Sequence, residues 1–215
     1  MAPRWPVVIF DIDGTLVNSV DLIVASYQHA FQTVLGHEWD ETEILTWLGQ
    51  SLIGAFQRRW PDQADALYRA YTDWNHAHTE ELLAEYPGVL ELTKDLVKAG
   101  VRVAAATSKR RDQAQWALDL ARLGTVVPLI VTHEDVDEHK PSPKPLLLAA
   151  RRLECPPAQA VYVGDAVVDI EAARAAGMAC VAVTWGAGVR EALAAQHPAW
   201  LVDTVDRLRD VLLPG

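Results

Sequence analysis

The hydrophobic pattern of this chain changes character twice along its length. It opens on the apolar, β-branched run Val7–Phe10, which has the composition of a fully buried strand. From Asn18 to Tyr86 the apolar positions recur at helical spacing, and no strand signal appears. From Pro87 onward, short apolar runs alternate with helical segments. The pattern therefore predicts a first strand, an inserted helical bundle and then an alternating α/β region.

Capping residues mark helix boundaries inside the helical stretch. Ser19 is expected to cap the first helix and Gly36 to close it. Asp40 with Glu43 resembles a capping box ahead of the next apolar run. We expect the last helix of the stretch to run to about Glu85.

The alternating region predicts a parallel sheet, because strands separated by helices pair in parallel. Strands are expected at Val101–Ala106, Leu129–Val131, Ala160–Val163, Cys180–Val183 and Trp200–Val202. Helices are expected at Val89–Ala99, Arg111–Leu123, Pro145–Leu153, Ile170–Ala176, Arg190–Gln196 and near Val205–Leu212. Gly100, Gly124 and Gly177 stand where the C-terminal glycines of helices belong. We expect an α/β fold: residues 1–17 and 87–215 form a Rossmann-like core with helices on both faces, and residues 18–86 form a helical domain.

Charge and cysteine content narrow the possible partners. A net charge of −10 argues against nucleic acid and anionic membranes. Small phosphate esters can still bind, because salt screens the general repulsion beyond about 8 Å. Cys155 and Cys180 lack the spacing of metal ligands and predict a reducing compartment without a structural disulfide. The first residues lack a signal-peptide pattern, so we expect a cytoplasmic protein that is a monomer or a weak homodimer.

Polar side chains gather where the predicted strands end. Asp11 and Asp13 follow the first strand, and alternation places them on one face, roughly 6.6 Å apart at Cα. In parallel sheets, ligands bind beyond the carboxyl ends of the strands, so we expect one site there. The candidate residues are Asp11, Asp13, Thr107, Ser108, Lys140 and Asp165. Carboxylates are rarely buried without a partner, and a hard cation is the natural one. Taken alone, Asp13-Gly14 is also an ordinary turn dipeptide.

Four segments, in chain order, carry a family resemblance. They are Asp11-Ile12-Asp13-Gly14-Thr15-Leu16, then Ala106-Thr107-Ser108-Lys109, then Lys140-Pro141-Ser142-Pro143, and Val163-Gly164-Asp165 with Asp169. Together they resemble the haloacid dehalogenase superfamily, specifically its phosphatases with a helical cap inserted after the first strand. The layout is similar to that of phosphoglycolate phosphatases. One departure is Ala166, where relatives often carry a small hydroxyl residue.

The resemblance implies a magnesium-dependent phosphomonoesterase that acts through a phosphoaspartate. Asp11 would be the nucleophile, and Asp13 would protonate the leaving alcohol and then activate water. To donate a proton, Asp13 must first carry one, so we expect other carboxylates to crowd it. Thr107 would hydrogen-bond the phosphoryl group, with an ordinary helix cap as the alternative. Lys140 would neutralise Asp11 and the phosphate, although a loop lysine taken alone is usually solvated.

The resemblance also implies a set of ligands for Mg²⁺. Asp11 and Asp165 would bind through their side chains and Asp13 through its backbone carbonyl. Two like charges 4 Å apart cost about 4 kcal/mol, a penalty that the cation removes. Asp169 would hold a metal-bound water, or would be an acid favoured by a helix N-terminus.

Further residues are candidates for binding substrate. Gly14, Thr107, Ser108 and Lys109 would bind phosphate. Lys109, Arg110 and Arg111 crowd a predicted helix N-terminus, which suggests a nearby anion or simple surface placement. In the cap, Arg58 or Arg59 could grip a carboxylate or a second phosphate, with a solvated helix face as the alternative. Gly49, Gln50 and Ser51 are additional candidates for substrate selection.

Several functions remain open on the sequence. A small phosphorylated metabolite is the expected substrate, with phosphoglycolate first and a sugar phosphate, a nucleotide or pyrophosphate as equal fits. A phosphosugar mutase would use the same acids, and a phosphoacceptor or binding protein without turnover is an alternative of another class. Dehalogenases and phosphonate hydrolases are disfavoured because they lack the acid at the position of Asp13. Motion of the cap about Thr15–Ser19 and Tyr86–Gly88 is a further hypothesis.

Overall fold

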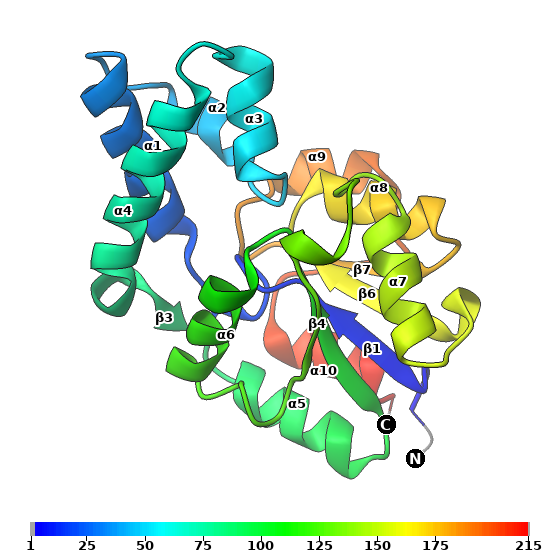
Figure 1. The fold of residues 1–215 in the computed structure, drawn as a ribbon. Helices are drawn as coiled ribbons and strands as arrows, with labels where there is room; N and C mark the ends of the chain where they lie inside the picture. The colour runs from blue at the N-terminus through cyan, green and yellow to red at the C-terminus, as the bar shows by residue number, and fades with distance from the viewer. Residues whose placement is uncertain (1–2, 215) are drawn as a thin grey trace.

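A six-stranded parallel sheet forms the centre of the molecule, in the computed structural model that describes residues 3–214 (Figure 1). The strand order is β5-β4-β1-β6-β7-β8, so the first strand of the chain lies near the middle. The strands are β1 (Val7–Phe10), β4 (Arg102–Ala106), β5 (Leu129–Val131), β6 (Ala160–Gly164), β7 (Ala179–Val183) and β8 (Trp200–Val202). The predicted α/β fold with a parallel, Rossmann-like sheet is confirmed.

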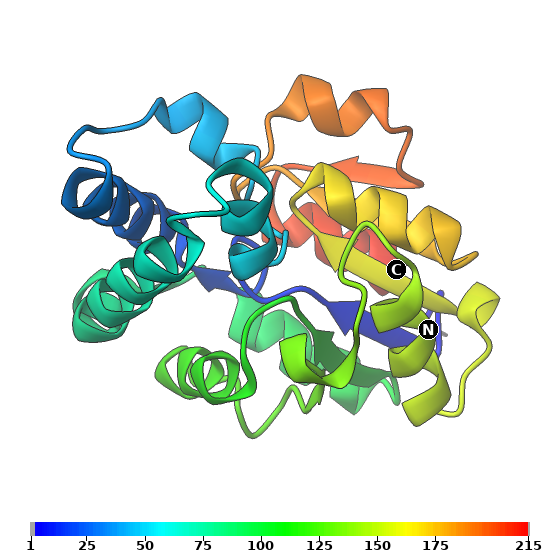
Figure 2. The ribbon, with the colours of Figure 1, turned by 45° about the horizontal axis from the view of Figure 1, so that its top comes forward.

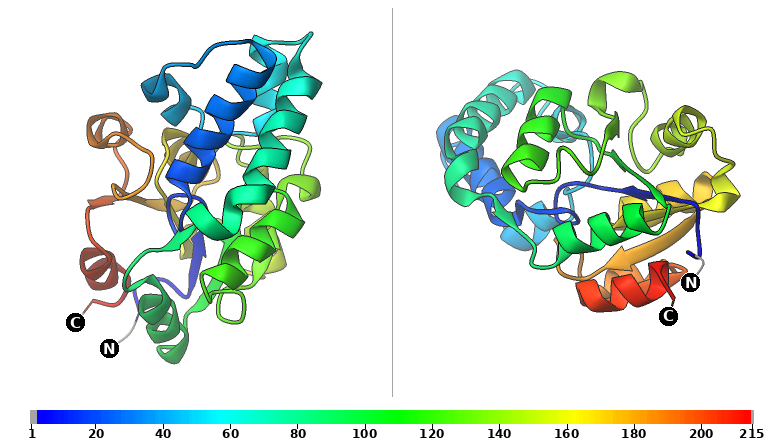
Figure 3. Two further views of the ribbon diagram at one scale, coloured as in Figure 1. Left: turned by 90° about the vertical axis from the view of Figure 1, so that its left-hand side faces the viewer. Right: turned by 90° about the horizontal axis from the view of Figure 1, so that it is seen from below.

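Helices cover both faces of this sheet. The alternation of side chains along β1 shows why: Val8 and Phe10 enter one core, and Val7 and Ile9 enter the other. The first core is covered by α5 (Val89–Lys98), α6 (Arg111–Leu120) and α10 (Val205–Leu212). The second is covered by α7 (Lys144–Arg152), α8 (Val167–Ala175) and α9 (Arg190–Ala195). Figure 3 shows the two helical layers on either side of the sheet.

A separate group of helices follows β1 and lies beyond its carboxyl end (Figure 2). The helices are α1 (Val20–Val34), α2 (Glu41–Leu45), α3 (Leu52–Arg59) and α4 (Ala64–Leu82), called the helical insertion below. They enclose a core of their own, in which Tyr27 stacks on Phe31 and both rings meet Phe56 in T-shaped, edge-to-face contacts. The division of the chain into two domains stays a prediction.

The insertion contains strand structure that the sequence analysis missed. β2 (Val17–Asn18) and β3 (Ala84–Glu85) pair antiparallel, so the expectation of no strand between residues 18 and 86 is wrong. Two residues are too few to show alternation, and both residues of β3 are exposed, so the pattern held no signal. This two-stranded ribbon pairs the segment that enters the insertion with the segment that leaves it.

Two predicted helix ends also need correction. Ser19 stands at the N-cap position of α1, but its hydroxyl donates to Asp13 at 2.7 Å instead of capping the helix. Helix α6 ends at Leu120, earlier than expected, and Arg122 rather than Gly124 takes the left-handed conformation, with φ +57°. The early turn brings Leu123 into the core. Asp40 caps α2 as predicted, because its side chain accepts from the Glu43 amide.

Two observations concern hydropathy and thiols. No helix within residues 3–214 combines the length and the apolar character needed to cross a membrane. Cys155 and Cys180 are free and buried, and both pack in the second core.

Candidate active site

The carboxyl end of β1 presents Asp11 in the interior of the protein. The Asp11 backbone amide donates to the Val163 carbonyl at 2.9 Å, which extends the β1–β6 pairing by one residue. Only 2% of Asp11 is exposed. Its Oδ1 is buried without a hydrogen-bond partner within the described chain, whereas its Oδ2 lies 3.0 Å from the Lys140 ammonium.

Asp165, at the end of the neighbouring strand β6, is fixed by contacts to both carboxylate oxygens. Thr15 Oγ1 donates to Oδ1 at 3.0 Å, and the Ala187 amide donates to Oδ2 at 2.8 Å. Gly14 makes this approach possible: its φ is +74°, and a Cβ there would lie 2.2 Å from Asp165 Oδ2. The glycine of the first motif is therefore required by the position of Asp165.

Lys140 is buried between two carboxylates, in contrast to the solvated lysine that its loop position alone suggested. Its ammonium lies 3.0 Å from Asp11 Oδ2, and donates to Asp169 Oδ1 at 2.6 Å and to the Tyr162 hydroxyl at 3.1 Å. Tyr162 in turn donates to the Ala106 carbonyl at 3.0 Å. Burial alone would lower the pKa of Lys140, but the charges of Asp11 and Asp169 outweigh it and hold that pKa well above its ordinary value.

Asp169 acts on its own helix as well as on Lys140. Its Oδ2 accepts the amides of Asp165 and Ala166 at 3.1 and 3.0 Å, at the start of α8. These contacts match the alternative interpretation of Asp169, an acid favoured by a helix N-terminus. Its place beside a metal-bound water stays a prediction. The missing hydroxyl at Ala166 leaves these backbone contacts intact.

Asp11, Asp165 and Asp169 together form a cluster that suits a hard divalent cation. Each offers one oxygen, and the three oxygens lie within 4.8 Å of one another. Burial raises the pKa of Asp165, helped by the charges of Asp169 and Asp11, and burial raises the pKa of Asp11 against the opposing charge of Lys140. Lys140 is thus the one cation set against three carboxylates here, and Asp11 Oδ1 has no hydrogen-bond partner within residues 3–214. Oxygen donors of this kind fit Mg²⁺.

Asp13 lies in different surroundings from those expected. Its Oδ1 accepts from Lys109 Nζ at 2.9 Å and from Ser19 Oγ at 2.7 Å. The crowd of carboxylates expected around Asp13 lies around Asp11 and Asp165 instead. The reason is that β1 ends at Phe10, so Asp13 lies beyond the strand and lines the cavity that faces the helical insertion.

The three basic residues at the start of α6 meet anions of the protein itself. Lys109 pairs with Asp13, Arg110 lies 3.6 Å from Glu134, and Arg111 pairs with Asp135 at 2.6 Å. Their position at a helix N-terminus thus needs no substrate anion to explain it. Binding of phosphate by Lys109 stays a prediction.

The segment Ala106-Thr107-Ser108-Lys109 places one hydroxyl in the site and directs the other to the insertion. Thr107 is buried and its Oγ1 accepts the Lys109 amide at 3.2 Å, but α6 begins only at Arg111 with Arg110 at the N-cap position, so Thr107 is not a helix cap. Ser108 Oγ donates to the Gly49 carbonyl at 2.9 Å and so links the end of β4 to the insertion. Binding of a phosphoryl group by either hydroxyl stays a prediction.

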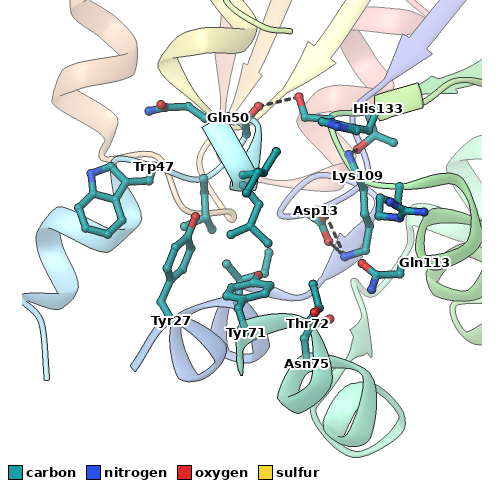
Figure 4. A pocket seen from close by; sticks show the side chains of 18 of the residues that line it. Asp13, Tyr27, Trp47, Gln50, Tyr71, Thr72, Asn75, Lys109, Gln113 and His133 are labelled. Atoms are coloured by element: carbon teal, nitrogen blue, oxygen red, sulfur yellow. Dashed lines mark hydrogen bonds and ion pairs between the residues drawn. The ribbon is translucent and has the colours of Figure 1, made fainter. Parts of the chain in front are cut away.

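A cavity of about 90 Å³ lies between the helical insertion and these strand ends. Asp11, Asp13, Thr107, Ser108 and Lys109 line it from the core side. Figure 4 shows the ion pair of Asp13 and Lys109 facing Tyr27, Tyr71 and Trp47, which come from the insertion. Since a water needs roughly 10–15 Å³ measured this way, the space suits a small ligand.

The cap arginines do not reach this cavity. Arg58 donates to the Gln50 side chain at 2.8 Å and lines a neighbouring cavity with Ser51, Lys140 and other residues. Arg59 lies over the Trp47 ring, 4.5 Å from its centroid. The geometry gives no support to Arg58 as a phosphate-binding residue, whereas Gly49 and Gln50 do line the cavity.

Sequence reasoning overlooked three contributors to the site. Thr15 and Ala187 bind Asp165, and Tyr162 binds Lys140. Thr15 could have been found from its hydroxyl, which directly follows Asp13-Gly14. Tyr162 could have been found because its side chain has a polar tip in the otherwise apolar strand β6. Ala187 contributes only its backbone amide, which no residue type reveals.

Comparisons with known proteins agree on one family. A family model described as haloacid dehalogenase-like hydrolase matches residues 8–183. The pyrophosphatase PpaX of Bacillus cereus strain G9842 is 33% identical over 209 residues, an alignment that covers 97% of each protein. The crystal structure of CbbY from Rhodobacter sphaeroides in complex with phosphate is 28% identical, with a TM-score of 0.77 and coverage of 93% of this chain and 94% of that one. The structure of a predicted phosphoglycolate phosphatase from Haemophilus somnus is 25% identical, with a TM-score of 0.83 and 97% coverage of both chains.

Proposed function

We propose a mechanism for this chain, which belongs to the haloacid dehalogenase-like hydrolase family and is a phosphatase. It hydrolyses a small phosphorylated metabolite through a phosphoaspartate on Asp11, with Mg²⁺ as cofactor. The observation that supports this most is Asp11 Oδ1, a buried carboxylate oxygen without a partner in the described chain, beside a lysine and two further acids.

The cation would be held by the side chains of Asp11 and Asp165 and the backbone carbonyl of Asp13, with Asp169 behind them. When bound, it neutralises the acids and draws electron density from a phosphoryl oxygen. The chain supports this placement by fixing Asp165 through Thr15 and Ala187.

In the first step, Asp11 Oδ1 attacks phosphorus while the bond from phosphorus to the leaving oxygen breaks. Lys140 stays against Asp11 Oδ2 and compensates the charge that the phosphoryl group brings. Thr107 and the amides that follow β4 receive the phosphoryl oxygens. The departing alcohol takes its proton from Asp13.

Asp13 must carry a proton to do this, and it is ion-paired with Lys109 at 2.9 Å. The incoming phosphate draws Lys109 away from Asp13 and binds Lys109, and Asp13 takes its first proton from solvent. In the second step Asp13 takes a proton from water, which attacks the phosphoaspartate and releases phosphate. The same carboxylate thus acts first as acid and then as base.

Phosphate release tests this mechanism. Release from a panel of phosphorylated metabolites should require Mg²⁺ and should be abolished in Asp11→Asn and Asp13→Asn. Exposed Asp62 supplies the control variant Asp62→Asn, which should retain activity. Rapid quenching should give a species phosphorylated on Asp11 in the wild type and in Asp62→Asn, and none in Asp11→Asn. Turnover in Asp11→Asn near the wild-type rate would refute the mechanism, and isomerisation of a sugar phosphate without phosphate release would indicate a mutase.

A further inference from the structure

We propose that the leaving group of the substrate is an uncharged alcohol with an apolar or aromatic body. The enzyme would then prefer phosphate monoesters of neutral alcohols to pyrophosphate and to esters that carry a carboxylate. This inference rests on the proposed function, because the reaction at Asp11 and Asp13 defines which end of the substrate leaves.

The leaving group must lie next to Asp13, where the helical insertion forms the opposite wall of the cavity (Figure 4). Aromatic and aliphatic side chains dominate this wall, among them Tyr27, Trp47, Leu48, Leu52 and Tyr71. Tyr27 and Trp47 are 3% and 2% exposed, so the wall is a continuation of the core of the insertion. Among the described residues, those that the insertion contributes to the cavity include no Lys, Arg, His, Asp or Glu.

Three polar side chains of this wall have partners inside the protein, whereas Trp47 Nε1 is a buried donor without a partner among the described residues. The Asn75 amide donates to Ser26 Oγ at 2.9 Å, and Thr72 Oγ1 donates to the Tyr68 carbonyl at 2.9 Å. The Gln50 amide donates to the Thr46 carbonyl at 3.0 Å. A second anionic group of a substrate would lose its hydration here and gain few donors in return.

The cations that line the cavity belong to its core side and are paired, whereas Arg58 and Arg59 of the insertion contact Gln50 and Trp47 without lining it. Lys109 binds Asp13, and Arg110 lies 3.6 Å from Glu134 and 3.8 Å from Asp112. Lys140 lies against Asp11, where the transferred phosphoryl group would bind. These cations therefore lie where one phosphoryl group would bind. The wall that faces the leaving group contributes no cation to the lining of the cavity within the described residues.

Matched substrate pairs test this directly. Benzyl phosphate and 4-carboxybenzyl phosphate differ by one carboxylate, as do ethyl phosphate and phosphoglycolate. With Mg²⁺ present, kcat/KM should be at least tenfold higher for the neutral member of each pair, and pyrophosphate should be a poorer substrate than benzyl phosphate. Equal or higher kcat/KM for the charged members, or for pyrophosphate, would overturn the inference.

A charge introduced into the wall should change this preference. Thr72 lines the cavity and is half-buried, so Thr72→Lys adds a cation there. We expect kcat/KM for 4-carboxybenzyl phosphate, relative to benzyl phosphate, to rise at least tenfold. Ala77 is exposed on the same helix, and Ala77→Lys should leave the ratio unchanged as the matched control. An unchanged ratio in folded Thr72→Lys would contradict the neutral wall.

The two proposals fail in different ways. If wild-type enzyme with Mg²⁺ releases phosphate but favours the charged substrates, the inference fails and the proposed function stands. If no phosphate is released from any substrate at any metal concentration, the proposed function fails and the inference falls with it.

Discussion

At the scale of single residues, the position of Asp165 depends on the absence of a side chain at Gly14. The left-handed φ of +74° costs a non-glycine residue about 1–2 kcal/mol, and a Cβ would lie 2.2 Å from Asp165 Oδ2. Gly36 has a similar φ of +79° but nothing within 4 Å of its virtual Cβ.

The pair gives a matched prediction. Gly14→Ala and Gly36→Ala should each lower the free energy of unfolding by about 1–2 kcal/mol in urea titrations. Gly14→Ala should in addition lower kcat/KM at least a hundredfold, because the metal-binding acid must move, whereas Gly36→Ala should retain activity. Equal activity in the two variants would contradict the packing described for Gly14.

Tyr162 supports Lys140 from beneath the site. Tyr162→Phe removes the acceptor of one Lys140 hydrogen bond and the donor to the Ala106 carbonyl. Leaving these buried groups unpaired should lower the free energy of unfolding by about 1–3 kcal/mol. Phosphatase kinetics should show a lower kcat with little change in KM, since Lys140 keeps both carboxylates. Wild-type stability and kcat in this variant would refute the assignment.

Sequence patterns were strong guides for some residues and weak for others. Asp11 and Asp165 were predictable because each ends an apolar strand that parallel pairing carries to one edge. The burial of Lys140 was not, because its loop has no apolar pattern and only tertiary packing brings Asp169 and Tyr162 against it. The surroundings of Asp13 depend on a turn whose direction the sequence left open.

At the scale of elements, Asp135 ties together α6, α7 and the 3₁₀ turn η1 (His133–Asp135) that follows β5. Arg111 and Arg152 donate to it at 2.6 and 2.8 Å, and the Thr132 amide donates at 2.8 Å. Partial burial would raise the pKa of Asp135, but the hydrogen bonds from Arg152 and Thr132 outweigh burial and lower that pKa from 3.8 to about 2.

A pH dependence of stability follows. Because the folded pKa lies below the unfolded one, the stabilisation is complete above about pH 4 and is lost as the pH falls through about 2. At neutral pH, Asp135→Asn should lower the free energy of unfolding by up to about 2 kcal/mol. Urea titrations should show this difference shrinking below pH 4, with Asp62→Asn as the control. A difference that grows on acidification would contradict the sign.

The hydrogen bond from Ser108 to Gly49 joins the strand ends to the insertion. Ser108→Ala should raise KM for a good substrate about twofold to tenfold, since one such bond contributes about 0.5–1.5 kcal/mol to holding the insertion against the strand ends. Thr33→Ala, on the exposed side of α1, is the control. An unchanged KM in Ser108→Ala would show that this contact does not help to hold substrate.

Among the elements, the six sheet strands were predictable because each is a short, mainly apolar run, fully or largely buried in β1, β4, β6 and β7 and half-buried in β5 and β8. The ribbon of β2 and β3 was not, because two-residue strands have no period to detect. The end of α6 was misplaced because burial of Leu123 decided it, which is a tertiary effect.

At the scale of the whole molecule, the reaction site exists only where two parts of the chain meet. The sheet supplies acids and cations at its carboxyl edge, and the helical insertion supplies a neutral aromatic wall. The strand ends thus set the class of reaction, and the helical insertion sets the choice of substrate. Family motifs in the sequence indicated the reaction class, whereas the choice of substrate could be inferred only from the positions of the insertion side chains.

The central claim is that the cluster of Asp11, Asp165 and Asp169 binds a divalent cation. Calorimetric titration of Mg²⁺ into the purified protein measures this most directly, with Asp165→Asn as the test variant and Asp62→Asn as the control. We predict one Mg²⁺ bound by the wild type and by the control, and affinity at least tenfold weaker in Asp165→Asn. Equal binding by Asp165→Asn and the wild type, or no binding by the wild type, would contradict the account.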